Sequence, residues 1–592
     1  MSTAAAPENR TARCLVIQLT GLDSVFRSLM ALRAAQQLYP TLDLSIVVFE
    51  EHADAVRKVP WIKNVHAFPR NGVAGPLARG EVNEAQATAA AARWLMPIGE
   101  HAWDFVVNWS YNEAGSYICA LVPSLVKLGY GRRGDGSISC VDGWSMYLQS
   151  VVLGDVPQDI HVTDVLTTQL LTALQIHLGD PAEAGGAAVT SREFFTLEHG
   201  RAQKVWKRHD SGQRWIAVQL CEAEAGGWDA AARAEFISSL LKRHANTAVV
   251  LLGKAEQRPM ARAILEAVDS SHRLRVVSLV GETDFDLWAS VIGLCQWMVA
   301  SDPAAIHLAS LLGTRVLQLA HKPEKWAEWG PYGNGHYVVS ADAGVQISPQ
   351  IVRAIWGYAH GEWAHQRETS LVEYLKSEGI KETSKIHPSR SRIRPGEEGG
   401  GVVFESLLPR PLGSSQWFAR VMGHVARHWY CGWTPPVGQE MGRSGFDQNL
   451  VRQLRNLRES VEVLERVLTR ASTAAGKLAR RSARLRSDRV MGVEDRKEIE
   501  ALGRELADLD GMIERLGGVQ EPLKAFARMS KVLMHNLEGD RIAEIARDSA
   551  DSYRQLHDGA RILSEWLDHS LKLVRPMVVS QKIHEAVPEA GL

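Results

Sequence analysis

Residues 297–319 read WMVASDPAAIHLASLLGTRVLQL, and this stretch decides the fold. It opens with a short apolar run at Trp297–Ala300, turns at Ser301-Asp302-Pro303 and continues as a helical pattern over Ala304–Leu312. Gly313 then ends the helix as a C-cap, and Arg315–Leu319 is a second apolar run. A strand, a helix and a strand in succession are typical of a parallel α/β unit.

The same alternation recurs in two series along the first 360 residues. Apolar strand runs and an amphipathic helix of the first series lie at Cys14–Leu19, Ser24–Tyr39, Leu44–Phe49 and Phe105–Val107. Strands and helices of the second series lie at Trp215–Leu220, Ala230–Arg243, Thr247–Leu252, Leu274–Leu279 and Trp288–Leu294. Two such series predict two Rossmann-like domains with a cleft between them, where ligands tend to bind.

Length and composition limit the class of protein. The chain has 592 residues, 45% hydrophobic and 23% charged, with a net charge of -1. These values are those of a globular protein of three to four domains, and they exclude a collagen-like, mucin-like or wholly disordered chain. The balanced charge argues against a dedicated nucleic-acid binder. Without an apolar signal core or a run of roughly 18 apolar residues, we expect a cytoplasmic protein with no membrane span.

The distribution of tryptophan divides the chain into two regions. Of the 18 Trp, 17 lie at or before Trp433, and only Trp566 follows. Beyond this point the pattern is helical, with a heptad seam of Leu450, Leu454, Leu457, Val461, Leu464 and Leu468 and further helices at 493–516, 523–536 and 541–574. We therefore predict domains at 1–175 and 176–365, a linker and docking segment at 366–440, and an all-α domain at 441–592, with self-association as one role for its helices.

The loop after the first strand carries the first candidate. Asp23 lies between the strand at Cys14–Leu19 and the helix that follows, where a ligand-facing carboxylate could act as a general base on an acceptor hydroxyl. The alternative is that Asp23 or Ser24 is simply the N-cap of the helix, and the sequence alone favours that interpretation.

The loop at Ser301–Ala309 carries the second candidate. Amides at a helix N-terminus bind anions, so a nucleotide diphosphate could dock here, with Asp302, His307 and the amides around Ile306 and Leu308 as its ligands. The alternative is an ordinary cap, with Asp302 as N-cap and Pro303 at the first helical position. The six Cys and the dispersed His show no metal-ligand spacing, so we predict no metal site.

The run Val280–Val339 contains, in order, Thr283, Asp302, His307, Leu308, Ala309, Gly313, Thr314 and Gly330-Pro331-Tyr332-Gly333. At these residues it resembles the donor-binding segment of the heptosyltransferase family, glycosyltransferase family nine. The opening LVIQLTGLDSVFRSLMALRAAQQLYP, WDFVVNW at Trp103–Trp109 and Leu128-Gly129-Tyr130 also look like family segments. The resemblance covers roughly residues 13–360.

What the resemblance implies is a GT-B fold and an inverting, metal-independent transfer from a nucleotide sugar, ADP-heptose or a related ADP-linked donor. An N-terminal-loop aspartate, here Asp23, would be the base. No cofactor or metal is implied, and the acceptor would be a lipopolysaccharide-core precursor or a protein.

The chain departs from the family pattern in three places. The family's Gly-Asp pair aligns with Asp23-Ser24, so Asp23 stands one residue early. The Thr/Ser-Gly-Pro of the donor loop aligns with Pro303-Ala304-Ala305, and a basic residue of the other donor loop is replaced by Gly227. Two hypotheses follow: an active glycosyltransferase, or an altered relative that serves as a scaffold or sugar-nucleotide sensor through its helical domain.

Overall fold

The structure is a computed structural model. It describes residues 11–585 except for 141, 155, 157, 181–193, 209–213, 222–227, 321–329, 343, 364–368, 381–382, 394–400, 409–416, 420, 424, 427–447, 485–491, 538 and 540. The chain divides into two compact units. Unit 1 comprises residues 1–127 and 160–408, and unit 2 comprises residues 128–159 and 409–592.

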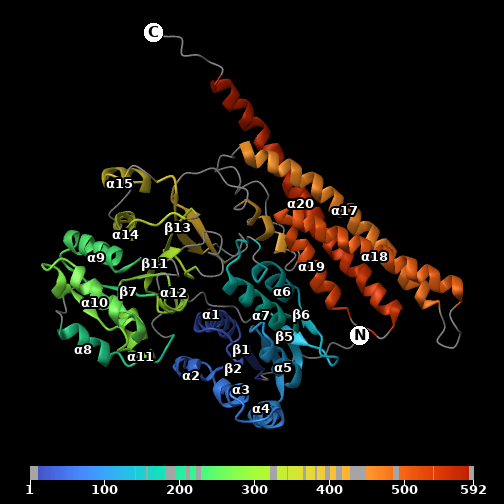
Figure 1. Cartoon of the computed structure of the whole chain (residues 1–592), viewed down its shortest axis with the longest axis horizontal. Helices are drawn as coiled ribbons and strands as arrows, with labels where there is room; N and C mark the ends of the chain where they lie inside the picture. Colours follow the sequence, from blue (N-terminus) through green and yellow to red (C-terminus); the bar gives the residue numbers. More distant parts are fainter. Residues whose placement is uncertain are drawn as a thin grey trace. The chain divides into compact units, whose positions relative to one another are not determined.

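The first half of unit 1 is built on a parallel sheet (Figure 1). Its strands pair in the order β3-β2-β1-β4, with bounds β1 (Arg13–Gln18), β2 (Asp43–Phe49), β3 (Asn64–Phe68) and β4 (Trp103–Asn108). The helices of this half are α1 (Leu22–Leu38), α2 (Glu50–Arg57), α3 (Arg70–Ala78), α4 (Glu84–Gly99), α5 (Glu113–Leu121) and α7 (Val162–Leu178). Because β1 is paired on both sides, its residues from Cys14 to Gln18 are all buried, as a central parallel strand requires.

The second half of unit 1 carries a second, mainly parallel sheet. Its order is β14-β13-β12-β11-β10-β7-β8-β9, with the parallel strands β7 (Arg214–Gln219), β8 (Thr247–Leu252), β9 (Val276–Ser278), β10 (Trp297–Ala300), β11 (Arg315–Ala320) and β12 (Tyr337–Ala341). Its helices are α8 (Gly200–Arg208), α9 (Ala230–Arg243), α10 (Arg258–Ala267), α11 (Phe285–Leu294), α12 (Pro303–Leu311), α14 (Pro349–Trp363) and α15 (Leu371–Ser377). The two parallel sheets predicted from the sequence are therefore present.

Two antiparallel strands extend the second sheet inside the stretch that the sequence assigns to a linker. They are β13 (Ile386–Ile393), which pairs with β12, and β14 (Val402–Ser406), which pairs with β13. In β13 the buried Ser389 and Ser391 alternate with the cations Arg390 and Arg392. A strand is predicted from apolar residues at every second position. Since the buried positions of β13 hold serines, the sequence does not show this pattern.

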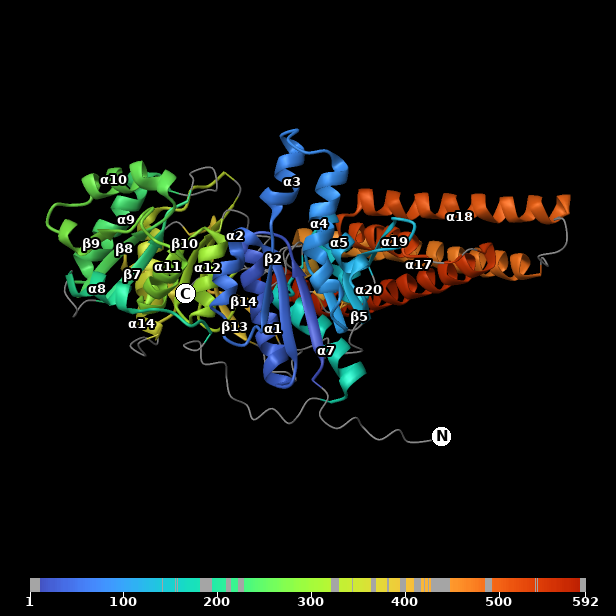
Figure 2. The ribbon, with the colours of Figure 1, turned by 90° about the horizontal axis from the view of Figure 1, so that it is seen from below.

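Unit 2 is mainly helical. It contains α17 (Gln448–Ala483), α18 (Val493–Val519), α19 (Lys524–His535) and α20 (Ile542–Glu585). The helices α17, α18 and α20, drawn from orange to red, run side by side in both views (Figures 1 and 2). The predicted seam residues Leu454, Leu457, Val461, Leu464 and Leu468 are buried, and Leu450 carries no burial description.

A segment far away in the sequence completes unit 2. Residues 128–159 contribute most of β5 (Ser124–Arg132), β6 (Ile138–Cys140), α6 (Gly143–Tyr147) and the π-helical turn η1 (Leu148–Val152). Helix α19 packs against β6, α6 and η1. Asn536 donates from Nδ2 to the Cys140 carbonyl at 2.6 Å and accepts from the Cys140 amide at 2.9 Å. Arg133 donates to the carbonyls of His535 and Leu537 at 3.1 and 2.8 Å.

The predicted boundaries at residues 175 and 365 both fall inside unit 1 and stay predictions. Within the described residues, no helix is both long and apolar enough to cross a membrane.

Candidate functional site

The first candidate lies in the first turn of α1. The helix begins at Leu22, and its N-cap is Gly21, whose carbonyl accepts from the Ser24 and Val25 amides at 3.1 and 3.2 Å. No side chain caps this end, so the interpretation of Asp23 or Ser24 as N-cap is wrong. The carboxylate of Asp23 is engaged by another residue, Arg27, one turn further along the helix.

Asp23, Ser24 and Arg27 form a small hydrogen-bonded cluster. Arg27 Nη2 donates to Asp23 Oδ2 at 3.1 Å and to Ser24 Oγ at 2.7 Å, and Ser24 Oγ lies 3.4 Å from Asp23 Oδ2. The Arg27 side chain is 7% exposed, whereas the Asp23 side chain is 29% exposed. The cluster therefore presents a carboxylate at the carboxyl end of β1 with an arginine behind it, an arrangement able to accept a proton from a bound hydroxyl.

The second candidate lies at the N-terminus of α12. Asp302 is the N-cap, its Oδ1 accepts from the Ala305 amide at 2.8 Å, and Pro303 occupies the first helical position. The capping interpretation of this loop is therefore confirmed. The Ile306 amide donates to the Asp302 carbonyl at 3.1 Å, and the side chains of Ile306 and Leu308 are fully buried in the core.

His307 is enclosed within unit 1. It is 0% exposed, and among the described residues neither ring nitrogen has a hydrogen-bond partner. Burial, followed by the charge of Arg27, holds the pKa of His307 well below its usual range, so the ring is neutral. An unpaired buried imidazole is costly and is uncommon away from functional sites. The structure thus brings Arg27, next to Asp23, close to His307 on the other half of unit 1.

His161 is a neighbour of His307 that sequence reasoning did not select. The two rings meet edge to face, with centroids 6.4 Å apart. Nδ1 of His161 accepts from the Thr163 amide at 3.1 Å, so by elimination the proton is on Nε2, which donates to the Gly330 carbonyl at 3.1 Å. No sequence signal could reveal this contact, since the partners stand 169 residues apart.

A residue in the first turn of α7, Asp164, is hydrogen-bonded to the segment that contains Tyr332. The Tyr332 hydroxyl donates to Asp164 Oδ1 at 2.8 Å, and Asp164 Oδ2 accepts from the Val402 amide at 2.9 Å. Tyr332 belongs to the Gly-Pro-Tyr-Gly run that resembles the family, so the helix of the first half fixes a predicted donor-side segment of the second half.

The two halves of unit 1 meet beside these residues. Phe26 of α1 packs against Phe285 and Trp288 of α11, with ring centroids 6.3 and 6.5 Å apart. Lys58 Nζ donates to Asp286 Oδ2 at 2.6 Å. Aromatic packing and an ion pair together fix how the two sheets face each other around Asp23 and His307.

Buried neutral histidines predict that unit 1 is destabilised by mild acid. Burial lowers the pKa of His161 to about 4 and that of His336 to about 3, against roughly 6.5 in an unfolded chain. The unfolded chain therefore binds more protons below pH 6.5, and stability falls as the pH falls towards 4. We expect a loss of roughly 2 kcal/mol per buried imidazole between pH 7 and pH 5, measured by urea unfolding.

A variant and its control sharpen this test. His161→Gln should be less stable than the parent at pH 7 and should show a shallower fall in the urea midpoint between pH 7 and pH 5. His177→Gln, at an exposed position on α7, should leave the slope unchanged. A midpoint of the parent protein that does not move over this range would contradict the assignment of neutral buried imidazoles.

The described side chains that could bind a metal ion are dispersed. Among the residues that the structure describes, no three His, Cys, Asp or Glu side chains gather closely enough to hold a metal ion. The described cysteines Cys14, Cys119, Cys140, Cys221 and Cys295 are buried free thiols.

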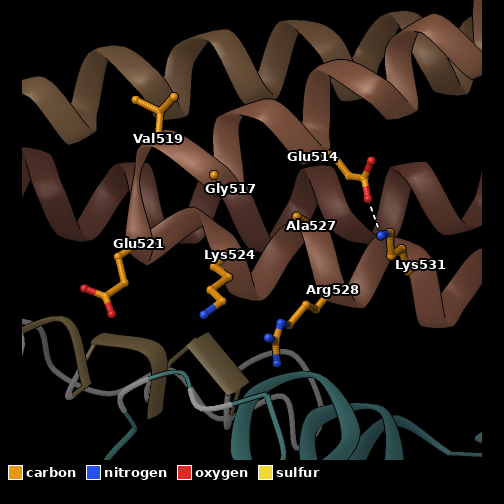
Figure 3. Close-up of a pocket in the computed structure, with 9 residues that line it drawn as sticks. Glu514, Gly517, Val519, Glu521, Lys524, Ala527, Arg528 and Lys531 are labelled. Atoms are coloured by element: carbon orange, nitrogen blue, oxygen red, sulfur yellow. Dashed lines mark ion pairs between the residues drawn. The ribbon is translucent and has the colours of Figure 1, made fainter.

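Unit 2 contains a separate pocket between the end of α18 and α19 (Figure 3). It encloses about 400 Å³ and is lined by Glu514, Gly517, Gly518, Val519, Glu521, Lys524, Ala527, Arg528 and Lys531. Lys531 forms an ion pair with Glu514, while Lys524 and Arg528 point away from α18 on the same side of α19. Since its charges nearly balance and none of its described lining atoms is an unpaired buried polar group, the candidate site in unit 1 is the stronger one.

A comparison with models of protein families finds a match over part of the chain. Residues 190–353 match the sequence model of glycosyltransferase family 9 (heptosyltransferase). The resemblance inferred from the sequence is thereby confirmed over this segment, which contains β7 to β12 and the whole of α12. A search of curated proteins finds no match.

Solved structures give matches of low identity. A glycosyl transferase family 9 protein from Veillonella parvula is 15% identical, with 63% of this chain and 98% of that chain covered and a TM-score of 0.45. The ADP-heptose lps heptosyltransferase II of E. coli is 15% identical, with 59% and 99% covered and a TM-score of 0.43. The E. coli heptosyltransferase WaaC with ADP is 16% identical, with 59% and 99% covered and a TM-score of 0.42.

Proposed function

Since residues 190–353 match glycosyltransferase family 9, we propose that the protein transfers a sugar from a nucleotide-sugar donor to an acceptor hydroxyl. The observation that carries the proposal is this match, because it includes the α12 N-terminus with Asp302 and His307. The donor is a heptose or similar sugar linked to a nucleoside diphosphate, with ADP as the first choice. The acceptor is a lipopolysaccharide-core precursor or a protein, and the reaction takes place in the cytoplasm without a metal or cofactor.

The proposed reaction is a direct displacement. The acceptor oxygen attacks the anomeric carbon while its proton passes to the carboxylate of Asp23. A new carbon–oxygen bond forms as the bond to the diphosphate breaks, and the leaving phosphate oxygen keeps the electron pair, so the anomeric configuration inverts. The positive end of the α12 dipole favours the charge that develops on the diphosphate.

A second function remains in competition, a sugar-nucleotide sensor or scaffold that acts through its helical domain. The observations that favour it are the use of Asp302 Oδ1 as a helix cap and the complete burial of His307. Both side chains would have to change partners or exposure to contact a donor. Binding and turnover distinguish the two functions, because a sensor binds the nucleotide sugar without consuming it.

We expect the full-length protein to bind ADP and an ADP-linked sugar with micromolar affinity in isothermal titration, and to bind AMP at least tenfold more weakly. The difference arises because a helix N-terminus gains most from the second phosphate charge. The exposed change Asp269→Asn serves as control and should leave the affinity unaltered.

Mass spectrometry of the protein incubated with nucleotide sugars and cell extract then measures turnover. Release of ADP together with a glycosylated product supports the transferase. Binding without release supports the sensor. Failure to bind any nucleoside diphosphate contradicts the transferase and the sensor and leaves the scaffold.

A further inference from the structure

The clearest unassigned feature of the candidate site is the way Asp23 is held. Its two carboxylate oxygens have different surroundings. Oδ2 accepts from Arg27 Nη2 and faces Ser24 Oγ, whereas Oδ1 accepts no hydrogen bond from the described residues. The oxygen without a partner is the one able to take a proton.

Gly21 leaves the space in which Asp23 Oδ1 lies. A Cβ built on Gly21 would stand 2.5 Å from Asp23 Oδ1, closer than a methyl group and an oxygen can approach, and at an ordinary distance of 3.7 Å from its Cγ. The backbone φ of Gly21 is -66°, which any residue can adopt, so the conformation does not require glycine. The glycine leaves room for the carboxylate to fold back over the N-cap.

Arg27 has Asp23 as its anionic partner. Among the described residues, His307 of α12 and His161 of α7 are titratable groups that interact electrostatically with Arg27, and both are neutral because burial lowers their pKa. A buried guanidinium needs a paired anion, and a buried pair of this kind fixes geometry more than it adds stability. The side chain at 7% exposure is thus a rigid support behind a carboxylate that is 29% exposed.

We propose that Arg27 and Gly21 are positioning residues that anchor Asp23 Oδ2 and present Oδ1 to the acceptor hydroxyl. This inference rests on the proposed transferase function. Arg27 Nη2 donates both to Asp23 Oδ2 and to the hydroxyl of Ser24, the residue that aligns with the family's aspartate.

The first test separates the rate of transfer from donor binding. Arg27→Met should lower kcat about 100-fold, since a misplacement of about 1 Å can cost that factor. The Kd for the nucleotide sugar should stay within twofold. Arg27→Lys should recover part of kcat, and Gly21→Ala should lower kcat because its methyl group displaces Oδ1. Arg33→Met, two turns further along α1, is the matched control and should keep kcat.

A double-mutant cycle provides the second test. If Arg27 acts through Asp23, then Arg27→Met should have almost no further effect on kcat in the Asp23→Asn background. Additive losses would overturn the inference. So would a loss of nucleotide affinity above tenfold in Arg27→Met, because Arg27 would then hold the diphosphate.

A crystal structure of the Arg27→Met protein needs no substrate and separates this inference from the proposed function. The Asp23 carboxylate should leave its place over Gly21. An unmoved carboxylate overturns the inference even if the parent protein transfers sugar. If the carboxylate is displaced in the variant and the parent protein turns over no donor, the positioning is supported and the transferase is refuted.

Discussion

The change Asp23→Asn is expected to lower the rate of sugar transfer by 10²- to 10⁴-fold, the range that a general base contributes. Asparagine keeps the shape of the side chain but cannot accept the proton of the acceptor hydroxyl. Single-turnover measurement with a saturating donor isolates this step from product release. The affinity for the nucleotide sugar should change little, because the base contacts the acceptor.

A carboxylate on another helix of the same half of unit 1 is the control. Asp54 of α2 is exposed and pairs with Arg57 one turn away, so Asp54→Asn should leave transfer unaffected. Full turnover by Asp23→Asn with a defined donor and acceptor would eliminate Asp23 as the base. Equal losses in both variants would point to a general effect on folding.

The second large effect is expected from removing the helices of unit 2. A chain that ends at Leu408 keeps residues 128–159 but loses α19, against which β6, α6 and η1 pack. Trp144 and Tyr147, buried in the full chain, belong to this segment. With exposed apolar surface and unpaired polar groups, the shortened protein should aggregate, as size-exclusion chromatography with light scattering would show.

Point variants of the full chain test the contact between α19 and residues 128–159 without removing any helix. Asn536→Ala removes the two hydrogen bonds to Cys140 and should lower the melting temperature, because the Cys140 backbone is left unpaired. His557→Ala on α20 is a comparison outside this contact. A shortened chain that is monodisperse and cooperatively folded would show that residues 128–159 do not depend on the helices.

Regular features of the fold could be predicted, because apolar strand runs and helical periodicity are local signals. The strands β1, β7, β8, β10 and β11 and the ends of α12 follow this rule, including the Asp302 cap and Pro303. Strand β13 could not be predicted, since its buried positions hold Ser389 and Ser391.

The candidate site likewise contains features that the sequence could predict and features that it could not. Asp23 and His307 stand in loops and helices that the sequence identifies, and the spacing of Asp23 and Arg27 by four residues is a helix ion-pair signal that could have been used. The contact of His161 with Gly330 depends on the packing of two distant segments, which one sequence without an alignment does not reveal.

The discontinuity of unit 2 also matters during synthesis on the ribosome. Residues 128–159 emerge about 250 residues before residue 409, which is roughly 10 to 50 s at common elongation rates. Throughout that interval their partner helices do not yet exist, while strands β1 to β4 of unit 1 have already been synthesised. During this interval the apolar side chains of residues 128–159 lack the helices that bury them in the full chain. A chaperone that shields apolar residues would protect the nascent chain at this stage.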